Sequence, residues 1–214
     1  MIKSLLHFNN PDDLTKDDVE RVSWQVNGTV ASSQDGKFGN CLSLDGNGYL
    51  QNNTIDLSLD KEWTLDMWVN IKTFSRSSVV SIVTDNSSHG IMFYDSFIYY
   101  GTGSSWGEIN LSSFVSTGTW MHFAFVNYLQ SLIVFINGVK ATTLAHSAIA
   151  WLPNPEVLIG ADRSVSRRFN GCIDEFRISD SALWTSDFTP PVNEYHFAKF
   201  IYIDKNNTVM GMKE

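Results

Sequence analysis

Short stretches in which apolar residues alternate with polar ones recur along the chain, and this pattern limits the fold more than any other feature. The clearest case is residues 63–71, where every odd-numbered residue is apolar and the even-numbered ones include Asp66 and Trp68. Successive side chains of a β-strand point to opposite faces, so this stretch predicts a strand with one face in a core. Further strands are expected at residues 4–8, 38–44, 49–50, 79–84, 90–94, 97–100, 108–111, 121–126, 132–136, 156–160 and 171–179.

Turn signals separate these strands, and helix signals are scarce. The pair Asn137 and Gly138 is typical of a tight β-hairpin, while the polar residues 12–22 could hold one helical turn. Many short strands joined by loops of similar length predict an all-β protein, an antiparallel sandwich of two sheets.

Composition narrows the classes of partner. The 214 residues carry a formal net charge of −8, whereas binding to nucleic acid or to an anionic membrane needs clustered Lys and Arg. The apolar runs are strand-sized and too short for a membrane-spanning helix. Residues 1–8 lack the features of a signal peptide. We therefore expect no nucleic acid partner, no membrane insertion, and either synthesis and assembly in the cytoplasm or a signal already removed.

Three motifs in order carry a resemblance to a known family. They are W-x-H at residues 120–122, G-x-I-D-E-F-R-I-S at 171–179 and F-T-P-P at 188–191. Together they resemble the laminin G-like, concanavalin A-type jelly-roll family over about residues 5–191. The resemblance implies one jelly-roll β-sandwich domain at residues 1–195. It also implies a protein that binds or builds, since members of this family rarely catalyse.

An acid, Asp174, lies in an otherwise apolar strand, where an unpaired carboxylate is costly to bury. The resemblance implies a structural Ca²⁺ held by Asp174, the carbonyl of Gly39 and a backbone carbonyl near Phe8 or Asn9, all oxygen ligands of the kind that Ca²⁺ prefers. Asn9 stands where the family often has Asp, which removes one charge from the site. The alternative is that Asp174 accepts backbone N–H bonds or pairs with an Arg.

The two cysteines, Cys41 and Cys172, belong to the same pair of predicted strands. If Gly39 lies opposite Asp174, the antiparallel register also places Cys41 opposite Cys172. Residues in that position approach disulfide range. Both a disulfide and two buried free thiols are compatible with this placement, and a domain of this size favours the thiols.

Two groups of residues are candidates for ligand binding. Asp66, Trp68 and His122 are expected to share one face of a sheet, as a sugar-binding group, as a catalytic remnant, or as a satisfied polar cluster capped by a loop. The stretch 94–106 is rich in aromatic residues, and we expect Tyr100 and Trp106 to be exposed for recognition. The basic loop with Arg163, Arg167 and Arg168 is predicted to be a solvated turn.

No catalytic motif is evident. Sandwich glycosidases that share this architecture carry E-x-D-x-x-E on one strand, and this chain has no such motif. We therefore predict a non-catalytic module that recognises glycans or a host-cell surface as part of a phage virion or bacterial surface assembly. The alternative is a purely structural decoration or assembly protein of the virion.

Residues 196–214 fall outside the family pattern and are predicted to form a C-terminal β-hairpin extension at 200–212. An isolated hairpin is marginal in water. It must therefore pack on its own sandwich or pair with another chain. We expect the second, a virion or homo-oligomer contact through residues 197–214, because an open apolar strand edge tends to recruit a partner.

Overall fold

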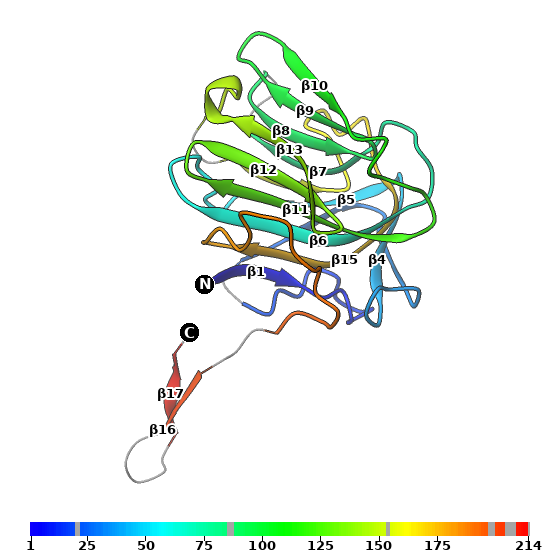
Figure 1. Ribbon diagram of the computed structural model, residues 1–214. Helices are drawn as coiled ribbons and strands as arrows, with labels where there is room; N and C mark the ends of the chain where they lie inside the picture. Colours follow the sequence, from blue (N-terminus) through cyan, green and yellow to red (C-terminus); the bar gives the residue numbers. More distant parts are fainter. Residues whose placement is uncertain (20–21, 85–87, 153–154, 197–199, 204–208, 214) are drawn as a thin grey trace.

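The computed structural model describes the chain except for residues 20–21, 85–87, 153–154, 197–199, 204–208 and 214, and its side-chain description ends at residue 196. Two antiparallel sheets pack face to face (Figure 1). This confirms the predicted all-β, two-sheet sandwich.

The first sheet holds the strand with the buried acid. Its order is β13 (Val139–Ala145), β12 (Ser131–Ile136), β11 (Trp120–Tyr128), β6 (Trp63–Ile71), β15 (Asn170–Ser179), β4 (Cys41–Asp45) and β3 (Ala31–Ser33), and β1 (Ile2–Leu6) also pairs with β15.

The second sheet has the order β10 (Trp106–Asn110), β9 (Phe97–Gly101), β8 (Gly90–Tyr94), β7 (Ser78–Val83), β14 (Glu156–Ile159), β5 (Gly48–Asn52) and β2 (Gln25–Gly28). One short 3-10 helix, η1 (His146–Ala148), follows β13. The predicted helical turn in residues 12–22 is wrong for the described part, where the chain makes only turns.

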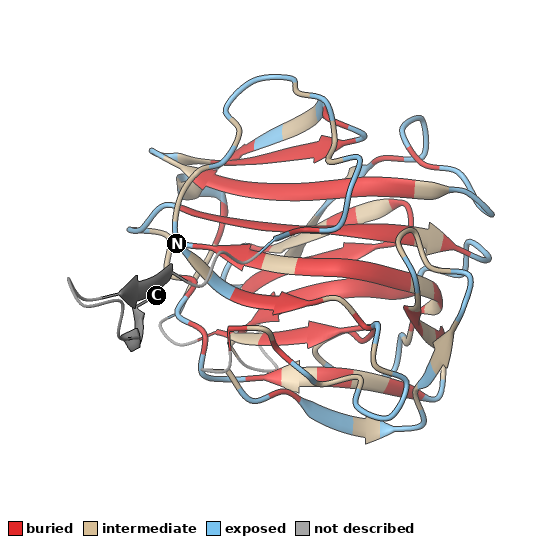
Figure 2. Ribbon diagram, turned by 90° about the horizontal axis from the view of Figure 1, so that it is seen from below, coloured by how far each residue is buried: buried red, intermediate tan, exposed pale blue. Residues whose placement is uncertain are grey.

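The core lies between the sheets, as the alternation predicts. Leu65, Met67 and Val69 of β6 are fully buried in it, and Phe93 of β8 contacts Phe123 of β11 with ring centroids 4.6 Å apart. The red strands of Figure 2 show that burial extends through both sheets.

The even-numbered residues of β6 are buried as well. A segment that follows β15, residues 180–195 (the cover segment), crosses the outer face of the first sheet (Figure 1). The Thr64 hydroxyl donates to the carbonyl of Ser181 at 2.8 Å, and the N–H of Phe188 donates to the carbonyl of Gly138 at 2.9 Å. Gly138 has φ 76°, and a Cβ there would lie 1.9 Å from the Phe188 oxygen. Glycine is therefore required where the β12–β13 hairpin meets the cover segment.

The register of β4 corrects the prediction for the cysteines. Cys172 lies opposite Ser43, two residues away from the predicted partner Cys41. The error arose because Gly39, with φ 75°, precedes the strand and is not paired in it. Both cysteines are free thiols, and a hydrogen bond between them lowers the pKa of Cys172 and raises that of Cys41.

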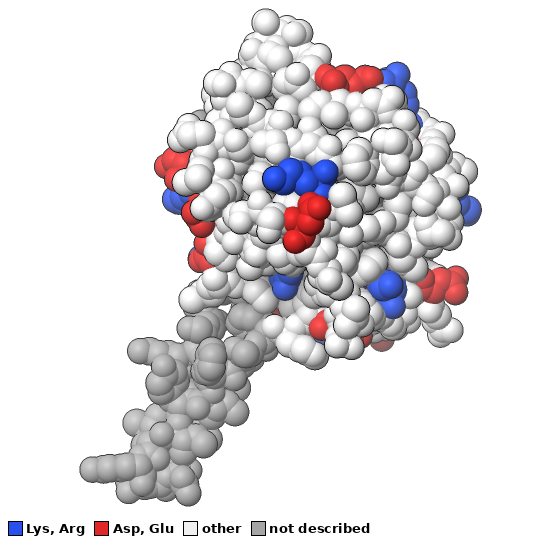
Figure 3. Space-filling model, in the orientation of Figure 1, with Lys and Arg blue, Asp and Glu red and all other residues white. Residues whose placement is uncertain are grey.

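The predicted C-terminal hairpin is present as β16 (Phe200–Ile203) paired with β17 (Val209–Lys213). These strands form a sheet of their own and join neither large sheet. No described helix has the length and apolar character needed to cross a membrane. On the face seen in Figure 3, positive and negative side chains are sparse and lie near one another, with no extended area of one sign.

Candidate functional site

The structure brings Asp66, Trp68 and His122 together on the outer face of the first sheet, as predicted, but encloses them. Asp66 is fully buried and receives a two-pronged ion pair from Arg177, with Nε–Oδ1 2.9 Å and Nη2–Oδ2 3.0 Å. The Tyr195 hydroxyl donates to Asp66 Oδ2 at 2.6 Å, and His122 Nε2 lies 3.2 Å from the same oxygen. Burial alone would raise the pKa of Asp66, but the His122 hydrogen bond and the Arg177 charge outweigh it and lower that pKa.

Aromatic side chains complete this enclosure. Trp184 stacks on Phe188 with ring centroids 4.0 Å apart, and both rings meet His122 edge-on at 5.7 Å. Trp68 is only 6% exposed, with the Lys37 ammonium 4.1 Å from its ring centre. A sugar ring has no access to this group while the cover segment is in place. The arrangement matches the predicted alternative, a polar cluster under a loop, except that the cluster is not fully satisfied. Among the described residues, the buried Nε1 of Trp68 and Nδ1 of His122 have no hydrogen-bond partner.

The outer face of the second sheet is built differently. Strand alternation turns Met92 and Tyr94 of β8, Tyr99 of β9 and Trp106 of β10 outward, where they form a cluster separate from the core. Met92 and Tyr94 are buried beneath the surface, whereas Tyr99 and Trp106 are half-buried and keep contact with solvent. Together with the loop at residues 162–167 they line a groove of about 390 Å³. We call this the aromatic groove.

Asp162 holds the loop side of the aromatic groove. Its Oδ1 accepts the backbone N–H groups of Ser166 (2.9 Å) and Arg167 (3.1 Å), and its Oδ2 accepts the hydroxyls of Ser164 (2.8 Å) and Tyr94 (3.3 Å). Burial and the Asp162 charge raise the pKa of Tyr94, so its hydroxyl stays protonated and donates. The loop is therefore fixed to the sheet by one carboxylate.

Arginines surround the aromatic groove. The guanidinium carbon of Arg163 lies 4.9 Å from the Trp106 ring centre, and that of Arg167 lies 6.0 Å from Tyr94. Arg76 lies 4.5 Å from the ring centre of Phe97, beside Tyr99. The loop predicted to be a solvated turn is thus held in place and lines one side of the groove, although Arg167 itself is exposed.

The two loop aromatics chosen from the sequence fall on opposite faces. Trp106 lines the aromatic groove. Tyr100 packs toward the core, and a Cβ on Gly107 would lie 2.1 Å from its ring. Tyr100 is half-buried, as Tyr99 is, but its ring packs toward the core, so Tyr99 and not Tyr100 lines the aromatic groove. The neighbouring Ile98 could have revealed this, because an apolar residue two positions before Tyr100 shares its face.

The predicted calcium ligands lie together beside the middle of β15, where Asp174 is opposite Trp68 of β6. Asp174 Oδ2 accepts the N–H of Phe38 at 2.9 Å, and Asn9 Oδ1 accepts the N–H of Asn40 at 2.8 Å, next to Gly39. Burial first, and the charge of Glu175 after it, raise the pKa of Asp174 to about 7. Oxygen atoms suited to Ca²⁺ are thus gathered, yet those of Asp174 and Asn9 already accept protein hydrogen bonds. Among the described residues, no group of three His, Cys, Asp or Glu side chains is placed to hold a metal.

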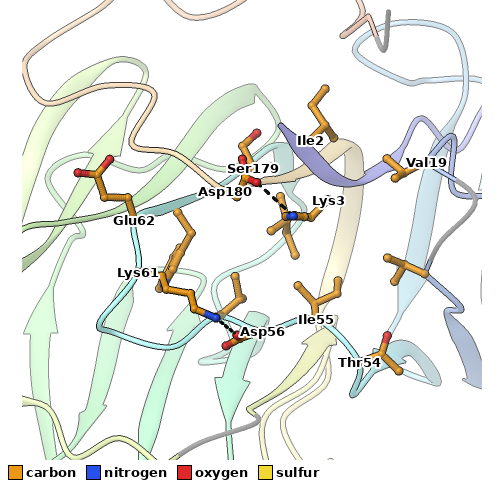
Figure 4. A pocket seen from close by; sticks show the side chains of 14 residues that line it. Ile2, Lys3, Val19, Thr54, Ile55, Asp56, Lys61, Glu62, Ser179 and Asp180 are labelled. Atoms are coloured by element: carbon orange, nitrogen blue, oxygen red, sulfur yellow. Dashed lines mark hydrogen bonds and ion pairs between the residues drawn. The ribbon is translucent and has the colours of Figure 1, made fainter. Parts of the chain in front are cut away.

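A larger cavity of about 610 Å³ lies near the N-terminus, between β1, the loop before β6 and the end of β15 (Figure 4). Its walls include the apolar side chains of Ile55, Leu57 and Trp63. Its charged groups are largely paired: Lys3 with Asp180 at 3.1 Å, and Lys61 with Asp56. The polar groups that could recognise a ligand therefore bind one another, which makes this cavity a weaker candidate than the aromatic groove.

A family model described as the concanavalin A-like lectin/glucanases superfamily matches residues 44–187, more than half of the chain. The chain belongs to this superfamily. Membership confirms the resemblance read from the three motifs. No curated protein sequence matches this concanavalin A-like chain significantly.

Solved structures share the fold of this concanavalin A-like chain at low sequence identity. Domain 4 of AbnA, a GH43 extracellular arabinanase from Geobacillus stearothermophilus solved with arabinotriose, is 21% identical at TM-score 0.69, with 86% of this chain and 94% of that chain covered. The binding domain of botulinum neurotoxin DC, solved with rat synaptotagmin II, is 15% identical at TM-score 0.63, with 86% and 49% covered. A botulinum neurotoxin type C structure, whose description concerns interaction with two ganglioside molecules, is 17% identical at TM-score 0.61, with 86% and 48% covered. This chain thus spans about half of the toxin chains.

One of these neighbours is described as a binding domain and another was solved with an oligosaccharide, while the superfamily name covers lectins and glucanases. A glycosidase needs two carboxyl groups on either side of the scissile bond. Among the described residues that line the aromatic groove, Asp162 is the one carboxylate, and its oxygens are engaged by the loop. The described residues of the groove therefore do not present the pair of carboxyl groups that this mechanism uses.

Proposed function

We propose that this protein is a non-catalytic module that binds glycans, free or on a cell surface, through the aromatic groove on the second sheet. The observation that carries the proposal is the pair of half-buried rings, Tyr99 and Trp106, beside a loop with hydroxyl and guanidinium donors. Ligand sites combine apolar surface with a few convergent polar groups. Aromatic faces contact the C–H-rich faces of sugar rings, and the donors bind sugar hydroxyls.

The structural neighbours support the same proposal. One was solved with an oligosaccharide and another is described through gangliosides. A binding function also fits the single engaged carboxylate of the groove. The sealed group of Asp66, Trp68 and His122 contributes stability in this proposal, not ligand contacts.

The test is a glycan array followed by titration calorimetry with the best binder. By analogy with base stacking, replacing Trp106 by Ala should cost about 1–3 kcal/mol of binding free energy. Tyr100→Phe is the matched control, because that ring faces the core and should leave affinity unchanged. The proposal fails if no glycan binds, or if binding survives Trp106→Ala intact.

Assembly is a second candidate function, favoured by the separate β16–β17 sheet. In this proposal the hairpin contributes a strand edge to a second copy or to another protein of a virion or bacterial surface structure. Calibrated light scattering of the chain with and without residues 197–214 tests it. The two functions are compatible, since they use different parts of the chain.

A further inference from the structure

Four of the six arginines of this acidic chain, Arg76, Arg163, Arg167 and Arg168, gather on the outer face of the second sheet. Each guanidinium lies within about 6 Å of an aromatic ring centre, the range of cation–π contacts. Two of them, Arg163 and Arg167, line the aromatic groove beside one carboxylate, Asp162. The charges of these groove residues therefore sum to +1 in a molecule of formal net charge −8.

The arginines differ in what their guanidinium groups bind. Arg76 donates to Glu108 at 2.8 Å and to the Tyr99 hydroxyl at 2.5 Å. Arg168 donates to the carbonyls of Val165 at 3.0 Å and Asn47 at 3.1 Å. Both groups are thereby committed to holding the surface together.

Among the described residues, Arg167 has no hydrogen-bond or ion-pair partner of this kind for its side chain. Its backbone N–H is bound by Asp162, which fixes the position of the residue. The side chain is exposed, and within the part of the chain that the structure describes no carboxylate lies within 4.0 Å of its guanidinium. The one carboxylate of the groove cannot readily rotate toward it, because Asp162 is held by four donors. A guanidinium whose donors no described residue engages thus lies at the groove on an anchored backbone.

We propose that the aromatic groove takes an anionic sugar residue, carboxylated or sulfated, whose charged group binds the Arg167 guanidinium. The planar fork of Arg matches the paired oxygens of such an anion, while Trp106 and Tyr99 contact the ring. This inference rests on the proposed glycan-binding function and specifies its ligand class. The long-range repulsion of an acidic protein makes non-specific binding of polyanions unfavourable, so the preference has to come from this groove.

The experiment uses the full chain and three probes of matched length: oligogalacturonate, a sulfated galactan oligosaccharide and a neutral galactan oligosaccharide. Hydrogen bonds to charged groups are worth enough to give a roughly 10-fold or greater preference for an anionic probe over the neutral one. Arg167→Gln should reduce the affinity for the preferred anionic probe to that for the neutral probe. Arg167→Lys should retain only part of the affinity difference. Lys140→Gln removes an exposed charge from β13 of the other sheet and should change nothing.

The outcomes separate the two proposals. Preference for oligogalacturonate alone identifies a carboxylated sugar, and preference for the sulfated probe alone identifies a sulfated one. Equal binding of all three probes, still dependent on Trp106, keeps the glycan-binding function and overturns the anionic class. If Lys140→Gln lowers the affinity for the anionic probe as much as Arg167→Gln does, the anionic class is also overturned, because general electrostatics would then explain the preference. Binding of no saccharide, on these probes and on the array, overturns both.

Discussion

The outer faces of the two sheets carry the same kinds of side chain but differ in how far these side chains are buried and paired. On the first sheet, the cover segment closes over Asp66 and His122, Lys37 and Phe38 pack on Trp68, and the acid is paired with Arg177 and Tyr195. On the second sheet, Tyr99 and Trp106 remain half-exposed beside an arginine whose side chain has no ion-pair partner in the described chain. The comparison teaches that an aromatic and charged group becomes a ligand site only where its polar atoms are left unpaired at the surface.

The largest expected effect on stability comes from a substitution on the outer face of the first sheet, under the cover segment. Replacing Asp66 by Ala leaves Arg177 with an uncompensated, mostly buried charge, and we expect a loss of about 3–5 kcal/mol in the free energy of unfolding. Guanidinium denaturation measures it. The double variant Asp66→Leu with Arg177→Met should recover much of the loss. If the single variant is as stable as wild type but loses glycan affinity, the sealed face is the binding site and the comparison is reversed.

The next effect on stability concerns Asp174, in the middle of β15. Its folded pKa of about 7 lies above the unfolded value of about 3.9. The unfolded chain therefore loses this proton first as pH rises. The contribution of Asp174 to stability falls between about pH 4 and pH 7, by about 2–4 kcal/mol, and is level above that range. The difference between wild type and Asp174→Asn, measured by urea denaturation in a chelator, isolates this term from the other titrating groups.

With Ca²⁺ bound, the contribution of Asp174 to stability should rise with pH instead of falling, because the metal binds the ionised carboxylate. We predict that Ca²⁺ at pH 8 raises the melting temperature of the wild type through Asp174, Gly39 and Asn9, and that Asp174→Asn abolishes the rise. A melting temperature indifferent to Ca²⁺ and chelator would mean that backbone N–H groups alone hold this acid.

A smaller effect on stability is expected from a substitution at the aromatic groove of the second sheet. Asp162→Ala removes the acceptor of two backbone N–H groups and the Tyr94 hydroxyl, which should cost about 1–3 kcal/mol of stability. It should also weaken glycan binding several-fold, because the loop that carries Arg167 loses its anchor. Asp60→Ala, at an exposed position outside the groove, is the control. Unchanged affinity in a destabilised Asp162 variant would exclude the loop from the site.

The smallest effect on stability is expected from deleting residues 197–214. Because β16 and β17 join neither large sheet, the free energy of unfolding should change by less than about 0.5 kcal/mol. The assembly state measured by light scattering should change. Unfolding of the truncated chain would instead assign the hairpin to the core of its own domain.

Sequence reasoning reached most of the fold because alternation is a local property. β6 and β8 have the predicted bounds, Trp63–Ile71 and Gly90–Tyr94. The short strands β2 and β3 were missed, and so was β13, whose sequence VKATTLA carries little apolar pattern on an exposed edge. The fold class survives such errors, since the core needs only the central strands.

The candidate sites were harder to predict. Alternation shows to which face of a sheet a side chain points, but not which other segments of the chain pack on that face. Nothing local to Asp66 shows that Arg177 and Tyr195, from 111 and 129 residues away, will enclose it. The aromatic groove was found only through Trp106, since Tyr94, Tyr99 and Arg167 become neighbours through the pairing of β8, β9 and β10 and the placement of one loop. Register and long-range packing carry that information, and single-sequence patterns do not.

The cover segment also sets an order of events during synthesis. A ribosome delivers Asp66 and His122 long before Arg177 and Tyr195, so the sheet can pair β6 with β11 while the acid still faces water. The outer face can close only after residue 195 has emerged, when contacts across more than a hundred residues form together. A nascent chain arrested before β15 should therefore hold an open, solvated Asp66. Release of the last twenty or so residues of the domain becomes the step that commits it to its final, closed form.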